Sequence, residues 1–82
     1  MRVTVSSRNK VRELRARHNI TQEKLSSFLG IKVDSYRKKE KEVMVWKEHE
    51  MHLVVYFFNH FYGEQLTLDE IFEADIIEIE NE

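Results

Sequence analysis

The residues of this chain that could carry chemistry are histidines with acidic neighbours. His49 and His52 stand three positions apart, a spacing that places both side chains on one face of a helix and would let them ligate a metal ion together. The segment reads His-Glu-Met-His, one residue short of the His-Glu-x-x-His pattern of zinc hydrolases. Because the sequence has no Cys and offers no evident third ligand, we expect surface or interface histidines, with no metal and no cofactor.

The sequence shows no pattern typical of an enzyme. We find no Ser-His-Asp arrangement, no Gly-rich phosphate loop and no paired carboxylates. The 82 residues allow one small domain, which leaves no room for a cleft between domains. The longest apolar run, Leu53 to Phe58, is too short to cross a bilayer, and no signal-like segment begins the chain. We therefore expect a cytoplasmic binding protein and not an enzyme.

The charge of −2 hides two halves of opposite sign. Residues 1–41 contain 12 Lys and Arg against 4 Asp and Glu, whereas residues 42–82 contain Lys47 alone against 11 acids. A basic half is the electrostatic footprint of a protein that binds a polyanion. A small protein with a solvated, charge-rich surface would show the same totals, so the positions of the cations decide between the two interpretations.

Apolar periodicity and capping residues predict about five helices between two strand-like ends. Ser6 and Ser7 could cap the first helix and Asn19 could end it in a left-handed conformation. Thr21 is a typical N-cap for the second, and Gly30 a typical end. The expected helices cover residues 8–18, 22–29, about 32–40, about 44–62 and 68–72.

The β-prone stretches lie at the two ends of the chain. Arg2 to Val5 and Ile76 to Ile79 could pair as a small sheet, within one chain or exchanged across a dimer. The competing interpretation is an acidic tail that repels phosphate. We accordingly divide the chain into a strand or arm over 1–7, a helical domain over 8–72 and an acidic strand or tail over 73–82.

Five segments of residues 8–72 form an ordered set of helix and turn motifs. They are Leu14-Arg15, Ile20-Thr21-Gln22-Glu23-Lys24-Leu25, Leu29-Gly30-Ile31, Ser35-Tyr36-Arg37-Lys38-Lys39-Glu40 and Leu66-Thr67-Leu68-Asp69-Glu70-Ile71-Phe72. With this set, residues 8–72 resemble the Cro/C1-type (XRE-like) helix-turn-helix family of phage and mobile-element repressors. The chain departs from the family at Lys39, where an apolar residue is usual, at Lys41-Glu42, where Asn-Gly or similar is usual, and in a longer stretch before the closing segment. The resemblance implies a mostly α-helical, lambda-repressor-like bundle.

The function implied by the resemblance is sequence-specific regulation of transcription by a homodimer on a double-stranded DNA operator, with Lys32–Glu40 in the major groove. Lys38 could donate to guanine, whereas Asp34 could accept only from a base amino group and would repel phosphate. The implied DNA-binding residues are Thr21, Gln22, Lys32, Val33, Asp34, Ser35, Arg37, Lys38 and Lys41.

The resemblance also implies a partly buried ion pair between Arg15 and Glu40, which would tie the first helix to the recognition helix. The 44–62 helix has apolar residues on more than one face, so we expect part of it to meet a second copy. The expected dimer residues are Leu53, Tyr56, Phe57 and Phe61.

A protein-interaction module, such as an anti-repressor or adaptor on the same scaffold, is the alternative. Asp34, the negative net charge and the acidic end favour it. Binding of random duplex DNA that weakens with salt would separate the two hypotheses.

Overall fold

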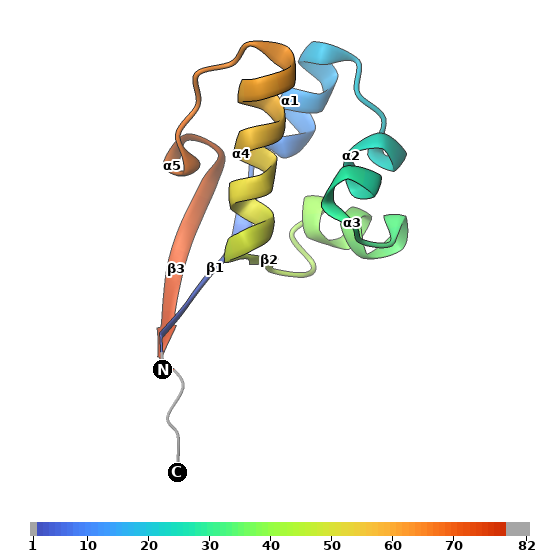
Figure 1. The fold of residues 1–82 in the computed structure, drawn as a ribbon. Coiled ribbons are helices and arrows are strands. Elements are labelled where there is room, and N and C mark those ends of the chain that lie inside the picture. Colours follow the sequence, from blue (N-terminus) through green and yellow to red (C-terminus); the bar gives the residue numbers. More distant parts are fainter. Residues whose placement is uncertain (1, 79–82) are drawn as a thin grey trace.

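The computed structural model describes residues 2–78, and within this range the chain folds into five helices and three strands. Figure 1 shows how these elements are arranged. The mostly helical class predicted from the sequence is confirmed. In chain order the elements are β1 (Arg2–Asn9), α1 (Val11–His18), α2 (Gln22–Leu29), α3 (Val33–Glu40), β2 (Trp46–Lys47), α4 (Glu48–Tyr62), α5 (Leu68–Ile71) and β3 (Phe72–Glu78).

Helix α4 occupies the middle of the bundle, between α5 on one side and the α2–α3 pair on the other (Figure 1). Its buried residues recur with helical spacing, so one stripe of the helix faces the core. Trp46, fully buried just before α4, meets Tyr36 of α3 and Phe72 of β3 edge to face, with ring centroids 5.8 and 5.3 Å apart. The largest fully buried side chains are Trp46, Tyr36, Phe58, Phe72, Leu25 and Met51.

The helix ends follow the local signals in the sequence. Asn19 and Gly30 end α1 and α2 in the left-handed conformation, with φ of 56° and 73°. The Thr21 hydroxyl accepts the backbone N–H of Lys24 at 3.0 Å and so caps α2 as expected. Short-range capping chemistry therefore sets the boundaries of α2 and the end of α1.

The start of α1 differs from the expectation. β1 continues to Asn9 and the helix begins only at Val11, so Ser6 and Ser7 lie in a strand and are not caps. The buried Ser6 hydroxyl lies within hydrogen-bonding distance of the Glu73 carbonyl oxygen (2.6 Å), whereas the Asn9 side chain accepts the N–H of Val11 at 3.1 Å. Pairing with β3 extends the strand past the position where helix periodicity alone would start the helix.

The expected small sheet is present within one chain, between residues 2–9 and 72–78, whereas Ile79 of the expected strand lies outside the described residues. β1 and β3 are antiparallel, with Val3 opposite Ile77 and Thr4 opposite Ile76, and they extend away from the helices as a two-stranded arm (Figure 1). A third strand, β2, was not expected. Its pairing with Val5 and Ser6 of β1 takes residues 46–47 out of the predicted 44–62 helix, which starts at Glu48 instead.

The last helix, α5, ends at Ile71, because Phe72 begins β3. Among residues 2–78, no helix has both the length and the apolar character needed to cross a membrane.

Candidate nucleic-acid interface

Helices α2 and α3 form a helix-turn-helix through the three residues Gly30, Ile31 and Lys32. The turn is closed by backbone bonds from the N–H groups of Gly30 and Ile31 to the carbonyls of Ser27 and Ser26, both 3.1 Å. Gly30 adopts a left-handed backbone with a φ of 73°, a conformation that glycine takes without the strain that a Cβ brings. The turn thus presents the outer face of α3 beside the N-terminus of α2.

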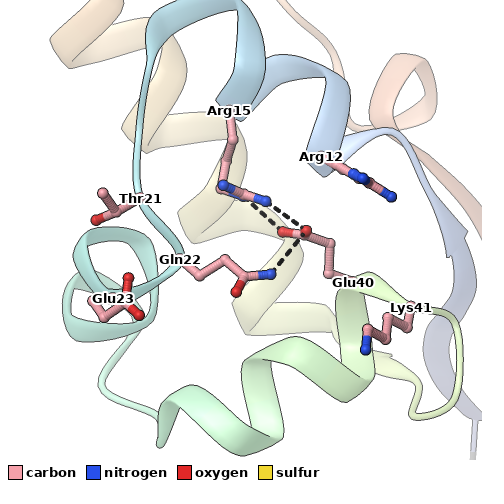
Figure 2. A pocket seen from close by; sticks show the side chains of 7 residues that line it. All are labelled: Arg12, Arg15, Thr21, Gln22, Glu23, Glu40 and Lys41. Atoms are coloured by element: carbon pink, nitrogen blue, oxygen red, sulfur yellow. Dashed lines mark hydrogen bonds and ion pairs between the residues drawn. The ribbon is translucent and has the colours of Figure 1, made fainter.

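Glu40, at the end of α3, is the centre of a polar network that holds this geometry. Arg15 of α1 donates two hydrogen bonds of 2.7 Å to the Glu40 carboxylate, from Nε to Oε2 and from Nη2 to Oε1. The Tyr36 hydroxyl donates to Oε2 at 2.6 Å, and Gln22 Nε2 donates to Oε1 at 3.2 Å. The ion pair expected between Arg15 and Glu40 is therefore present, and Figure 2 shows Arg15 and Gln22 converging on the carboxylate.

The network changes the acidity of its members. Burial opposes ionisation of Glu40, but hydrogen bonds from Arg15 and Tyr36 outweigh it and hold the pKa of Glu40 below its ordinary value. Burial, followed by the hydrogen bond to the Glu40 carboxylate, raises the pKa of the Tyr36 hydroxyl. Glu40 is consequently a carboxylate at neutral pH, and it links α1, α2 and α3 through one buried charge.

The structure divides the expected DNA-binding residues into an exposed and an internally bonded set. Gln22 and Arg37 belong to the second set, because Arg37 Nε donates to Gln22 Oε1 at 3.1 Å. The guanidinium also pairs with Glu23 at 3.2 Å and with Asp34 at 3.4 Å. The remaining positions are exposed at Thr21, Lys32, Asp34, Lys38 and Lys41, and half-buried at Val33 and Ser35.

Arg12 of α1 is a cation at this face that the sequence reasoning missed. Arg12 and Lys41 line one cleft of about 490 Å³ together with Thr21 and the Arg15–Glu40 pair. In Figure 2 both cations lie on one side of Glu40, opposite Thr21. Helical spacing was the available signal, since a residue three positions before Arg15 falls on the same face of α1.

A second buried ion pair, also missed, explains the departure at Lys39. The Lys39 ammonium lies 2.6 Å from Glu50 Oε1 and 3.1 Å from the Val45 carbonyl oxygen, and both charged side chains are buried. Glu50 also accepts the backbone N–H of Lys47 at 2.8 Å at the start of α4. At the position where an apolar residue would pack into the core, Lys39 instead forms an ion pair that joins α3 to α4.

The four residues expected at a dimer interface divide into buried and exposed positions. Phe57 is only 3% exposed within the single chain, so its side chain is part of the core and offers little surface to a second copy. Leu53 is partly buried against the core. Tyr56 and Phe61 are about half exposed, and Phe61 borders a groove of about 540 Å³ between α2 and α4.

The histidines show no metal geometry within the described part of the chain, where no three His, Asp or Glu side chains are grouped to hold an ion. His49 and His52 are exposed on α4. His18 instead lies 2.8 Å from Glu64 and packs against the Tyr62 ring. Hydrogen bonds from His18 and Arg17 lower the pKa of Glu64. His18 therefore joins the end of α1 to the end of α4.

Comparison of the chain with protein-family models, with curated proteins and with solved structures gave no match.

Proposed function

We propose that this protein is a sequence-specific double-stranded DNA-binding regulator of transcription, of the Cro/C1 repressor type, which acts in the cytoplasm as a homodimer and places α3 in the major groove. The observation that carries the proposal is the helix-turn-helix α2–α3. The Arg15–Glu40 ion pair holds α3 against α1, and the outer face of α3 is exposed to solvent. A helix held in this way beside a bracing helix suits the width of the major groove.

The charges on this face support DNA as the ligand. Lys32, Lys38 and Lys41 are exposed, and none of them forms an ion pair with the side chains that the structure describes. Arg12 adds a cation on α1, at the cleft that the N-terminus of α2 also borders. In this arrangement Lys38 reads a base edge, and Arg12, Lys32 and Lys41 contact phosphates.

Binding of fluorescent random duplexes at several salt concentrations tests the proposal. We expect a dissociation constant that rises steeply between about 50 and 200 mM salt, because each phosphate contact releases a counterion. Lys24→Ala is the matched control, since Lys24 is an exposed lysine of α2 beside Tyr62 and away from the α3 face. Selection from random duplexes should then yield a preferred operator. Failure to bind any duplex at low salt would sink the proposal.

A protein-interaction module is the second candidate, and the state of Arg37 favours it. The Arg37 guanidinium forms ion pairs with Glu23 and Asp34 of its own chain, so it is not free to bind a phosphate. Asp34 is also exposed on the face of α3 that would contact DNA, where its carboxylate would repel phosphate. An anti-repressor or adaptor would use this same face for a protein. A protein-interaction module should not bind random duplexes in a salt-dependent manner, so the duplex titration separates the two candidates.

A further inference from the structure

Three consecutive apolar residues are exposed shortly after α3, and the first of them is the most exposed large hydrophobic residue among the side chains that the structure describes. Val43, Met44 and Val45, here called the loop patch, are three consecutive exposed hydrophobics, and Val43 keeps 75% of its surface in solvent. Runs of this kind are rare on proteins that act alone, because they leave apolar area in contact with water.

The loop patch has a fixed backbone. The N–H groups of Val43 and Met44 both donate to the Lys38 carbonyl oxygen, at 2.9 and 3.1 Å. The buried Lys39 ammonium donates to the Val45 carbonyl oxygen at 3.1 Å while it is paired with Glu50. An apolar surface that is already ordered loses little conformational entropy when a partner covers it. This rigidity distinguishes the loop patch from an ordinary mobile loop.

A recess lies beside the loop patch. It has a volume of about 660 Å³ and is open between β1 and the start of α4; Val45 belongs both to its wall and to the loop patch. We call it the β1–α4 groove, and its lining includes Thr4, Val45, Lys47, Glu48, His49 and His52. An exposed apolar surface and a recess therefore adjoin at Val45.

We propose that this face is the two-fold interface of a homodimer, in which Val43 and Met44 of each copy enter the β1–α4 groove of the other. The inference rests on the homodimer of the proposed function and assigns its surface. A projection and a recess on the same face complement each other when a second copy is turned by a two-fold axis, and such contacts close at two subunits. Because the loop patch follows α3 by two residues, a two-fold axis there would also relate the two recognition helices, as two DNA half-sites one turn apart require.

The charges at the groove favour a second copy over another occupant. Lys47 and Glu48 are exposed neighbours of opposite sign, so a two-fold axis can set Lys47 of one copy against Glu48 of the other in two equivalent pairs. Among the described residues, the lining of the groove between α2 and α4 has one charged side chain, Lys24, and no acid, so that groove offers no pair of opposite charges for a two-fold contact.

Sedimentation equilibrium of the full chain without DNA tests the interface. We expect a dimer of the 10.0 kDa chain at tens of micromolar. Val43→Asp and Met44→Asp should each raise the dimer dissociation constant about tenfold or more. Phe61→Asp, at the exposed aromatic side of α4, is the matched control and should leave that constant unchanged. Thermal unfolding of each variant shows whether the exposed substitutions leave the fold intact.

Charge exchange tests the two-fold symmetry directly. Lys47→Glu and Glu48→Lys should each weaken the homodimer several-fold, because each places like charges opposite one another. The double variant, and an equimolar mixture of the two single variants, should both recover dimerisation. If the single variants lose dimerisation, and neither the double variant nor the equimolar mixture recovers it, Lys47 and Glu48 are not in contact across a two-fold axis.

Three results would overturn the inference. The first is a wild-type chain that stays monomeric at high concentration, and the second is a dimer lost with Phe61→Asp and kept with Val43→Asp. The third is a loop patch whose substitution weakens DNA binding while dimerisation is unchanged, since the loop would then contact DNA. Salt-dependent duplex binding by a monomer would support the DNA-binding part of the proposed function while removing both the homodimer and this interface.

Discussion

The ammonium of Lys39 lies 2.6 Å from a carboxylate oxygen of Glu50, with both side chains buried between α3 and α4. Two charges removed from water in this way depend on each other, because either one alone would remain desolvated without compensation. The pair also fixes the loop between the helices through the Val45 carbonyl oxygen and the Lys47 N–H. The orientation of α3 relative to α4 thus depends on one ionic contact inside the core.

Replacing either Lys39 or Glu50 alone should lower the free energy of unfolding, whereas replacing both with apolar residues should change it little. We expect Lys39→Ala to lower the free energy of unfolding by about 3–5 kcal/mol, because it leaves the buried Glu50 carboxylate unpaired. The double variant Lys39→Met, Glu50→Leu should come within about 1 kcal/mol of wild type, or exceed it. Urea denaturation of the single and double variants measures both values. Additive losses in the double variant would show that the two side chains are not coupled.

Arg15 should matter for stability and not for base preference. Arg15→Ala removes two hydrogen bonds to Glu40 and one to the Ile20 carbonyl oxygen, and we expect a loss of about 2–4 kcal/mol, below the fully buried limit because Arg15 keeps some exposure. Arg17→Ala, at an exposed ion pair with Glu64, should cost less than about 1 kcal/mol. Under conditions where both variants are folded, operator selection should return the wild-type sequence. A changed base preference would place Arg15 at the DNA.

The Glu40 network should make stability depend on pH in acid. A carboxyl whose pKa is lower in the folded chain binds its proton more readily when unfolded, so its stabilisation is complete above the ordinary value of 4.5 and is lost as pH falls through the folded pKa. We expect Glu40→Gln to flatten the decrease in unfolding free energy below about pH 5. Glu13→Gln, at an exposed position of α1, should keep the wild-type slope. Equal slopes for Glu40→Gln and wild type would contradict the assignment.

Glu42 should be a site of relievable backbone strain. Its φ is +66°, a conformation that costs a residue with a Cβ about 1–2 kcal/mol. We expect Glu42→Gly to raise the free energy of unfolding by up to about 1 kcal/mol, even though a weak 3.4 Å hydrogen bond from the Asn9 N–H is lost. Lys41→Gly is the matched control, because Lys41 has a φ of −81° and gains only chain entropy there. It should lower stability by about 0.5–1 kcal/mol.

The cations of the proposed DNA face should separate by role. Lys38→Ala should relax the preference at one base position by about 1–3 kcal/mol, whereas Arg12→Ala and Lys41→Ala should weaken all sequences equally and reduce the salt slope by about one each. Fluorescence anisotropy with the selected operator and its single-base variants measures both effects. If none of the three substitutions changes binding, α3 does not lie in the groove as proposed.

The sequence by itself determined the elements whose signals are local. Thr21, Gly30 and the apolar spacing of Leu25 and Leu29 predicted α2 correctly, because capping and helical periodicity act within a few residues. The family resemblance supplied the Arg15–Glu40 pair, which the structure contains.

Only the tertiary structure decided the features that depend on distant residues. Pairing of β1 with β3, across nearly the whole chain, extended β1 to Asn9, and β2 took residues 46–47 from the expected helix. The packing of α4 placed Phe57 in the core, and the approach of α3 to α4 paired Lys39 with Glu50. Strand pairing, burial and ion pairing depend on which segments meet in space, and local propensity contains no information about those meetings.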